Sequence, residues 1–396
     1  MLMVFMTLPW SWIHAQQFTN YTTADGLPAD NVNGVAIDSK NHKWFGTQGG
    51  VAMFNDTVWK VYTTTDGLTD NNITCIAVDK NGLIWAGTES GLNQFNGSVW
   101  TTYTTTNGLI NDMITYIAGD SDGSVWIGTN GGVSHLSGQT WKNYTMADGL
   151  PAELISYIIA DNTGNIWFGT WLGGLSKFDG TKFTNYTTTD SLPDNSILAI
   201  ANGKENTKWI GTFNGVAVFD SLDEWETTYR ASDGLLNNYI QDIAMDSKGT
   251  MWFGIYDTYT QDGGISRYST SGWKSYTIAD GLVNALVRRI AVDLMDNIWI
   301  ATGNGVSRLT ESNAGISEQS GQNICIYPNP ATIEVNITGL TCSAVLQIFD
   351  ITGNELKTVN LSAGSNTIAL SGLKPGIYFV QIRTGKESLT RKLILR

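Results

Sequence analysis

The chain has 396 residues, which is long enough for two or three domains with a sizeable core. It contains 43 Gly, 15 Trp and 15 Tyr but only 15% charged residues, which favours many short strands joined by tight turns over a helical bundle or a disordered chain. The net charge of −13 argues against nucleic acid as a partner. Three Cys without close spacing and only three His argue against a zinc ribbon and a disulfide-dense scaffold, so we expect neither a metal nor a cofactor.

The apolar N-terminus predicts export. Residues 1–15 read MLMVFMTLPWSWIHA and carry no Lys, Arg, Asp or Glu. This stretch is shorter than the roughly 20 residues of a transmembrane helix, so we interpret it as a signal peptide with cleavage between Ala15 and Gln16. A membrane-facing or buried segment is the alternative. No other apolar stretch approaches membrane-spanning length, and we expect no transmembrane segment in the mature chain.

A unit of 41 to 47 residues recurs seven times in the middle of the chain. Most copies contain Asp-Gly-Leu, a β-branched run, a Gly/Asn turn, Trp-aliphatic-Gly-Thr and Gly-Val/Leu-x-x-Phe. The Gly of the first motif, or its substitute, is found at Gly26, Gly67, Gly108, Gly149, Ser191, Gly234 and Gly281. The Trp is present in every copy, at Trp44, Trp85, Trp126, Trp167, Trp209, Trp252 and Trp299. A Trp at this spacing predicts a core position between repeats, and the Gly that usually follows two residues later predicts a close approach of neighbouring repeats.

Each unit contains four strand candidates separated by turns. In the second copy they are Ile73–Val78, Ile84–Gly87, Leu92–Phe95 and Trp100–Tyr103. Four strands per repeat of this length predict an all-β fold, a seven-bladed β-propeller over residues 16–309. The chain enters with the outer-strand motif Phe18–Tyr21 and leaves the array at the third-strand motif Gly305–Leu309. We therefore expect the N-terminal strand to close the last blade, which removes an open sheet edge.

The repeats resemble the two-component-regulator propeller family, known from the extracellular sensor regions of hybrid histidine kinases. The resemblance rests on blocks such as Asp25-Gly26-Leu27-Pro28 and Asn165-Ile166-Trp167-Phe168-Gly169-Thr170, and it runs from about Phe18 to Leu309. Local departures are Ser191 in place of Gly, Ile255 in place of Thr and Ala301 in place of Gly. The membrane helix and kinase of those sensors are not found in this sequence, so the resemblance does not imply signalling.

The composition changes near Thr310. Residues 310–323 (TESNAGISEQSGQN) are small and polar without periodicity, which predicts a flexible linker. Several short strand candidates follow within residues 324–396, which favours a small β-sandwich. These strand candidates are Ile333–Ile337, Val345–Phe349, Thr367–Leu370, Ile377–Ile382 and Leu389–Leu395.

The tail resembles the C-terminal sorting domain of the type IX secretion system. The matching motifs, in order, are Ile326-Tyr327-Pro328-Asn329-Pro330, Ile348-Phe349-Asp350-Ile351-Thr352-Gly353, Leu373-Lys374-Pro375-Gly376-Ile377-Tyr378 and the basic-apolar end of the chain. The resemblance implies the type IX machinery as a partner, passage across the outer membrane of a Gram-negative bacterium, removal of the tail, and display on the cell surface or release. Cys325 and Cys342 both lie in this tail, and the sequence leaves open whether they pair.

Acidic and amide residues follow the Asp-Gly-Leu motifs and predict a collar around the mouth of the propeller. Its carboxylates are Asp30, Asp70, Asp112, Glu153 and Asp194. Two interpretations stay open. The side chains either satisfy backbone donors where a strand begins or form a ligand site for a sugar or a cation.

Aromatic residues in loops break the repeat pattern. Trp171 and Phe213 stand where other copies have polar residues, and an insertion in the sixth copy adds Tyr256 and Tyr259. An aromatic side chain in an exposed loop can stack on a sugar face or pack against the neighbouring loop.

These observations predict an exported, monomeric module that binds a carbohydrate or a protein ligand on the cell surface or in the medium without catalysis. The alternative is a polysaccharide lyase or glycoside hydrolase acting at the propeller mouth, which requires two acids at catalytic separation and a perturbed pKa. A passive structural or adhesion module is a further alternative, and it would bury Trp171, Phe213 and Tyr256 against their neighbours.

Overall fold

The computed structural model describes residues 17–310, 325–327, 331–340, 342–350, 353–384 and 387–396. The signal peptide predicted for residues 1–15, the cleavage point between Ala15 and Gln16, and the predicted linker beyond Thr310 lie outside the described residues. The chain divides into two compact units, one of which is Gln17–Thr310. None of the helices within these described segments has the length and apolar character needed to cross a membrane.

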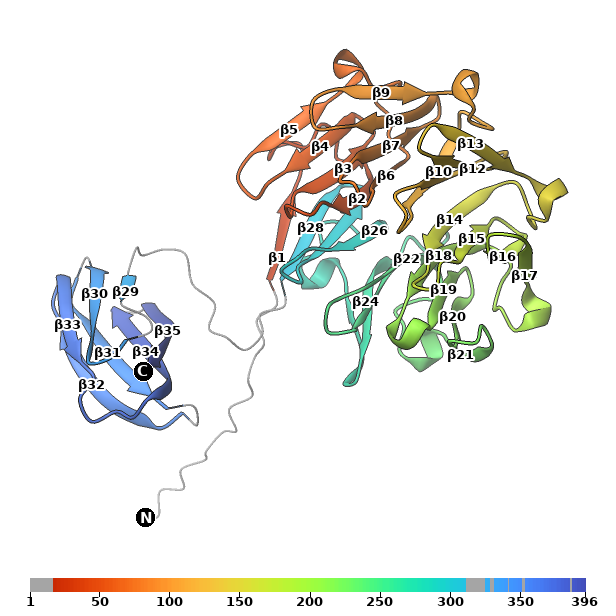
Figure 1. Cartoon of the computed structure of the whole chain (residues 1–396). Coiled ribbons are helices and arrows are strands. Elements are labelled where there is room, and N and C mark those ends of the chain that lie inside the picture. Colours follow the sequence, from red (N-terminus) through yellow and green to blue (C-terminus); the bar gives the residue numbers. More distant parts are fainter. Residues whose placement is uncertain (1–16, 311–324, 328–330, 341, 351–352, 385–386) are drawn as a thin grey trace. The chain divides into compact units, whose positions relative to one another are not determined.

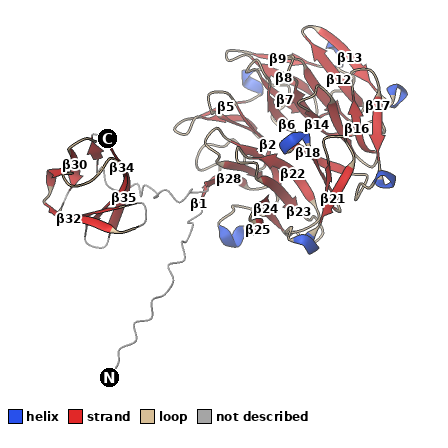
Figure 2. Ribbon diagram, turned by 60° about the horizontal axis from the view of Figure 1, so that its bottom comes forward, coloured by secondary structure: helices blue, strands red, loops and turns tan. Residues whose placement is uncertain are grey.

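The unit Gln17–Thr310 is a ring of seven antiparallel four-stranded sheets (Figures 1 and 2). The first strands of the blades face the central channel and are β2 (Val32–Ile37), β6 (Cys75–Val78), β10 (Ile114–Gly119), β14 (Ile155–Ala160), β18 (Ile197–Asn202), β22 (Ile240–Met245) and β26 (Val287–Val292). The second strands are β3 (Lys43–Thr47), β7 (Ile84–Thr88), β11 (Val125–Thr129), β15 (Ile166–Thr170), β19 (Lys208–Thr212), β23 (Met251–Tyr256) and β27 (Ile298–Thr302).

The outer half of each blade completes its sheet. The third strands are β4 (Gly50–Phe54), β8 (Gly91–Phe95), β12 (Gly132–Ser137), β16 (Gly174–Phe178), β20 (Gly215–Phe219), β24 (Gly263–Ser269) and β28 (Gly305–Thr310). The fourth strands are β5 (Trp59–Tyr62), β9 (Trp100–Tyr103), β13 (Thr140–Tyr144), β17 (Phe183–Tyr186), β21 (Trp225–Tyr229), β25 (Gly272–Tyr276) and, for the last blade, β1 (Gln17–Tyr21).

The ring closes as the sequence predicts. Strand β1 pairs antiparallel with β28, with Gln17 opposite Thr310 and Tyr21 opposite Val306. The hydroxyl of Ser307 also donates a hydrogen bond to Oδ1 of Asn20 at 2.7 Å. The seven-bladed β-propeller with an N-terminal closing strand is therefore confirmed.

Short 3₁₀ helices, coloured blue in Figure 2, follow the fourth strands. They are η1 (Thr64–Asp66), η2 (Thr105–Asn107), η3 (Met146–Asp148), η4 (Thr188–Asp190), η6 (Ala231–Asp233) and η7 (Ile278–Asp280). At η1 the backbone N–H of Thr63 donates to the Asp66 carboxylate at 2.8 Å, and the chain leaves through Gly67 with φ of 108°. A left-handed φ at the end of the turn favours glycine, so the repeated Thr-x-x-Asp-Gly motif is a capped turn between blades.

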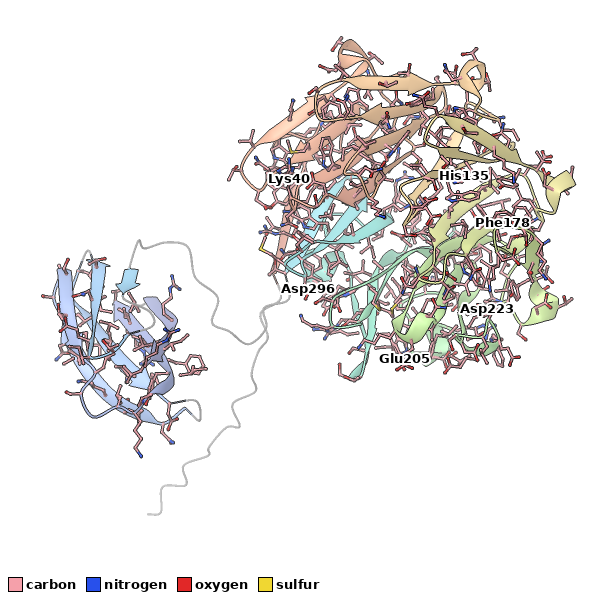
Figure 3. The ribbon with its side chains drawn as sticks, in the orientation of Figure 1. Lys40, His135, Phe178, Glu205, Asp223 and Asp296 are labelled. Atoms are coloured by element: carbon pink, nitrogen blue, oxygen red, sulfur yellow. The ribbon has the colours of Figure 1, made fainter. Side chains whose placement is uncertain are left out.

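Each seam between neighbouring blades is filled by the Trp of the second strand. Six of the seven Trp side chains are at most 5% exposed, and Trp209 is partly buried. Trp126 shows how the seam is packed, because His135 of its own blade stacks on its ring at 3.9 Å and Phe178 of the next blade lies 5.9 Å away (Figure 3). The predicted core role of this Trp is confirmed.

The glycine two residues after the Trp sets the distance between blades. A Cβ added at Gly169 would lie 2.8 Å from Cγ2 of Ile197 on the next blade, and one added at Gly87 would lie 2.6 Å from Cγ2 of Ile114. These separations are shorter than van der Waals contact, so glycine permits the close approach that the sequence predicts. In the last blade Ala301 takes this place and clusters with Val32, a smaller residue than the Ile of most blades.

An Asp holds the Trp indole in six of the seven blades; four of these residues are buried, and Asp38 and Asp120 are partly buried. The carboxylate of Asp161 accepts a hydrogen bond from Nε1 of Trp167 at 3.0 Å and one from the backbone N–H of Asn165, also at 3.0 Å. The equivalent pairs are Asp38–Trp44, Asp79–Trp85, Asp120–Trp126, Asp246–Trp252 and Asp293–Trp299. In the fifth blade Gly203 takes the place of the Asp, and the short helix η5 (Lys204–Asn206) follows it.

The tail forms two sheets around its own core. One sheet has the order β29 (Cys325–Tyr327), β30 (Glu334–Leu340), β33 (Gly364–Ala369), and the other has the order β32 (Glu355–Leu361), β31 (Ala344–Phe349), β34 (Gly376–Thr384), β35 (Glu387–Leu395). The strand β32 was not predicted from the sequence. Its side chains are mostly exposed, and only Leu361 is buried, so its apolar pattern is weak. Cys342 is a free, exposed cysteine, and the side chain of Cys325 lies outside the described residues.

Candidate functional site on the upper face

We call the face with the 3₁₀ turns and the loops between second and third strands the upper face. The aromatic residues predicted in these loops come together over the fourth to sixth blades. Trp171 and Phe213 meet edge to face with ring centroids 5.2 Å apart, Phe213 and Tyr239 are 5.4 Å apart, and Tyr239 and Tyr259 are 6.3 Å apart. We call these four residues the aromatic row.

The aromatic row is packed on one side and open on the other. Trp171 is 40% exposed and Tyr259 is 85% exposed, whereas Phe213 and Tyr239 are partly buried. Ring contacts between blades join Trp171, Phe213 and Tyr239, whereas Tyr259 contacts Tyr239 within the sixth blade. Such contacts favour one arrangement of the rings before a ligand arrives. The predicted residue Tyr256 lies at the end of β23, where it is partly buried and its backbone carbonyl accepts a hydrogen bond from Gln241 at 3.3 Å.

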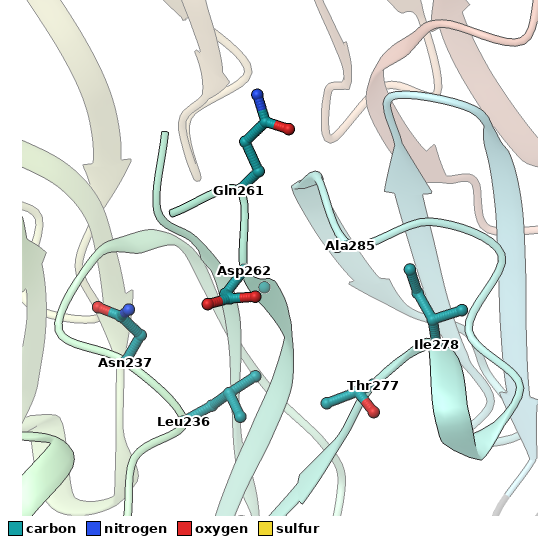
Figure 4. A pocket seen from close by; sticks show the side chains of 8 residues that line it. Leu236, Asn237, Gln261, Asp262, Thr277, Ile278 and Ala285 are labelled. Atoms are coloured by element: carbon teal, nitrogen blue, oxygen red, sulfur yellow. The ribbon is translucent and has the colours of Figure 1, made fainter. Parts of the chain in front are cut away.

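The insertion in the sixth blade forms one wall of a cavity of about 440 Å³. Gln261 and Asp262 of this insertion stand across from Thr277 and Ile278, which belong to the turn that leads into the last blade (Figure 4). Asp257 anchors the insertion, because its carboxylate accepts a hydrogen bond from the backbone N–H of Tyr259 at 2.8 Å. That hydrogen bond holds the pKa of Asp257 below its ordinary value.

The predicted carboxylate collar is distributed around the blades, and the side chains of its four Asp residues bind the turns. Asp30 accepts from the backbone N–H of Thr23 at 2.7 Å, and Asp112 accepts from that of Thr105 at 2.6 Å. Asp70 and Asp194 accept from backbone N–H groups two residues later, at 2.8 and 2.6 Å. Glu153 is exposed, and its backbone carbonyl accepts from Gly132. These hydrogen bonds correspond to the turn interpretation of the collar residues, while ligand binding by them stays a prediction.

Four side chains from four blades meet in the central channel. The hydroxyl of Tyr157 donates to Asp242 at 2.7 Å, and the guanidinium of Arg289 lies 5.3 and 5.4 Å from the ring centroids of Tyr116 and Tyr157. They surround a small cavity of about 60 Å³. Burial raises the pKa of Asp242, although Arg289 and the hydrogen bond from Tyr157 act in the opposite direction. We call Tyr116, Tyr157, Asp242 and Arg289 the channel cluster.

Sequence reasoning missed Tyr239 and the channel cluster. The signal for the cluster lies at the two positions that follow a recurring Ile or Val at the start of each inner strand or just before it. These dipeptides are Asn33-Gly34, Thr74-Cys75, Thr115-Tyr116, Ser156-Tyr157, Leu198-Ala199, Gln241-Asp242 and Arg288-Arg289. They differ in every blade, whereas the positions around them repeat. Within the described segments, no group of three or more His, Cys, Asp or Glu side chains could hold a metal ion.

The geometry defines the class of the protein as a seven-bladed β-propeller joined to a small β-sheet domain. Comparison with family models finds two component regulator propeller repeats at residues 67–90, 108–131, 149–172 and 234–257. It finds a secretion system C-terminal sorting domain at residues 325–396. The chain therefore carries two component regulator propeller repeats together with a C-terminal sorting domain of the type IX secretion system. The sorting domain implies export to the cell surface or secretion.

Solved structures with similar folds come from several kinds of protein. The extracellular domain of a hybrid two component system from B. thetaiotaomicron is 18% identical with a TM-score of 0.66, and the match covers 96% of this chain and 57% of that one. PorZ, a surface component of the type IX secretion system of Porphyromonas gingivalis, is 17% identical with a TM-score of 0.61, at coverages of 93% and 60%. A streptogramin B lyase is 14% identical with a TM-score of 0.62, at coverages of 74% and 97%.

These identities are low enough that the matches show the fold alone. The chain spans less than two thirds of the length of the sensor domain and of PorZ. No curated protein sequence matches the chain.

Proposed function

We propose that this chain is an exported propeller that binds a carbohydrate or protein ligand on its upper face without catalysis, at the cell surface or in the medium. The observation that carries the proposal is the aromatic row, since Trp171 and Tyr259 keep large exposed ring surfaces while each also contacts another ring of the row. Exposed rings held in this way suit stacking on a sugar or burial under a partner surface.

The distribution of acids supports a binding role over hydrolysis. Three cavities are each lined by one carboxylate. Asp262 lines the cavity beside the insertion, Asp242 lines the small cavity in the channel, and Glu89 lines a cavity at the mouth of the channel. Glycoside hydrolysis uses two carboxylates that flank one bond. A binding site needs only shape, aromatic surface and hydrogen-bonding groups.

The test is a glycan-array screen of the full chain, followed by the same screen with Trp171→Ala and Tyr259→Ala. We expect both variants to lose binding and to keep the thermal stability of the wild type. Trp225→Ala is the matched control, because Trp225 is 47% exposed on the outer strand β21 and should bind as the wild type does. Binding that survives both row substitutions, or release of sugar products during the assay, would contradict the proposal.

A further inference from the structure

A second cavity occupies the mouth of the central channel on the upper face. It has a volume of about 380 Å³ and is lined by residues of the first, second, sixth and seventh blades. We call it the mouth pocket. Its lining is almost entirely polar: the amides Asn33, Gln48, Asn72 and Gln241 and the cations Arg288 and Arg289, with Leu286 as its apolar residue. The volume lies toward the lower end of the range of small-ligand sites, about 300–1,000 Å³.

Arg288 is a cation that has no carboxylate partner among the residues that the structure describes. It is partly buried, and among the described residues no Asp or Glu oxygen forms an ion pair with it within 4.0 Å. Its Nε is buried and has no hydrogen-bond partner within the same residues. Burial and the neighbouring Arg289 lower the pKa of Arg288, but a guanidinium stays protonated at neutral pH. A partly buried charge without a partner is costly unless something else supplies one.

The surroundings of Arg288 do not compensate this charge. Arg289 directs its Nη1 to the backbone carbonyls of Gln241 and Arg288, at 3.1 and 3.0 Å, and faces the acid Asp242 deeper in the channel. Glu89 is the acid of the mouth pocket, and it is exposed. The Oδ1 of Asn72, another lining residue, is buried without a hydrogen-bond partner in the described part of the chain. Two residues that line the pocket therefore carry a buried donor and a buried acceptor without a hydrogen-bond partner in the described part of the chain.

We propose that the mouth pocket binds one acidic sugar unit of a carbohydrate ligand, with its anionic group on Arg288 and its hydroxyls on the amides. A guanidinium pairs with an anionic oxygen through strong charge-assisted hydrogen bonds. Amides can both donate to and accept from hydroxyl groups. A peptide with apolar side chains fits less well, because Leu286 is the one apolar residue among those that line the pocket. This inference rests on the proposed function and adds the charge of the ligand to it.

The experiment is isothermal titration calorimetry of the full chain with a short oligogalacturonate and with the methyl ester of the same oligosaccharide. We expect the acid to bind, the ester to bind at least about tenfold more weakly, and added salt to weaken binding of the acid. Arg288→Gln should weaken binding of the acid by about tenfold or more, because it removes the charge but keeps a polar side chain of similar reach. A sulfated oligosaccharide that binds through Arg288 would support the anion site with sulfate as the anion.

Two further variants sharpen the test. Glu89→Gln should strengthen binding of the acid, since it removes the negative charge that lines the pocket. Lys182→Gln changes the net charge by the same amount as Arg288→Gln, at an exposed turn outside the pocket, and should leave binding unchanged.

Three results would overturn the inference. Equal binding of acid and ester that Arg288→Gln does not change would remove the anion site but leave ligand binding on the upper face intact. Binding of an acidic peptide through Arg288, with no binding of saccharides, would refute the sugar assignment. If none of these probes binds, the mouth pocket has no such role, and the array screen with the aromatic-row variants still judges the proposed function separately.

Discussion

The seams between blades and the lining of the central channel are built from the same repeats. Seam residues recur from blade to blade, whereas the residues that line the channel differ between blades. Every seam must fit one shape, in which a Trp fills a wedge and a glycine lets the next strand approach, so Trp167 and Gly169 have equivalents in most blades. The channel receives side chains from seven blades that each face a different neighbour across the axis. Repetition therefore marks packing in this molecule, and departures from it mark positions that are available for binding.

Removal of a seam Trp should have the largest effect on stability. Trp167 is completely buried, and Trp167→Ala should lower the free energy of unfolding of the propeller by about 3–5 kcal/mol through lost burial and the cavity left behind. Trp225→Ala, which alters a Trp that is 47% exposed, should cost less than about 1 kcal/mol. Denaturant unfolding measured by fluorescence compares the two. Equal losses of stability in the two variants would contradict the larger contribution of the buried seam Trp.

A methyl group added at the seam should cause the second largest loss of stability. Gly169→Ala would place a Cβ 2.8 Å from Cγ2 of Ile197, and such overpacking costs about 1–3 kcal/mol. In a double-mutant cycle, Ile197→Ala removes that Cγ2, so the two substitutions together should destabilise the propeller by less than the sum of the single effects. Strict additivity in urea unfolding would show that the glycine does not set the distance between blades.

The Asp–Trp pair should make seam stability depend on pH. Burial acts to raise the pKa of Asp161, but hydrogen bonds from Trp167, Thr163 and Asn165 outweigh it and hold the pKa well below its ordinary value. A carboxyl whose folded pKa is depressed stabilises the fold above its unfolded pKa, near 4, and loses this contribution as the pH falls through the folded pKa.

Asp161→Asn tests this dependence. The variant should be about 1–3 kcal/mol less stable than the wild type at pH 7, because it loses hydrogen bonds to a charged acceptor. The difference should shrink progressively below about pH 4. Urea unfolding of both proteins across this pH range measures it, and a difference independent of pH would contradict the ionised state of Asp161.

The smallest effect on stability is expected at Lys43, a charged residue at a seam position where most other blades have an apolar residue. Lys43 is completely buried, with Nζ 2.7 Å from Asp56 and 3.8 Å from Asp293 of the last blade. The sixth blade has Met251 at the equivalent position. Lys43→Met should therefore change the free energy of unfolding by less than about 1 kcal/mol, because neither acid is left buried without a partner. The side chain of Asp56 is 37% exposed, and Asp293 keeps its hydrogen bonds from Asn297 and Trp299. Thermal unfolding checks this, and a loss similar to that of Trp167→Ala would show that the closing seam depends on the ion pair.

Sequence reasoning succeeded where the same residue type has the same structural role in each repeat. The recurring Trp, the glycine after it and the unpaired first strand Phe18–Tyr21 predicted the seams and the closure of the ring. It failed for two other features. The hydrogen bond between Asp161 and Trp167 recurs in six blades, but it joins residues six apart across a turn, and neither residue type alone indicates it. The strand β32 was missed because an edge strand with polar side chains lacks the alternation that identifies strands.

The number of blades, the closing strand and the sorting tail could be predicted from the sequence, because repeat length, turn motifs and strand order are properties of neighbouring residues. Which side chains meet depends on how the chain folds in three dimensions. Tyr157 and Asp242 are 85 residues apart and hydrogen-bond in the channel, and the aromatic row joins loops of three blades. Closure of the ring brings such residues together, and the distance between them across the axis is not encoded in any local pattern.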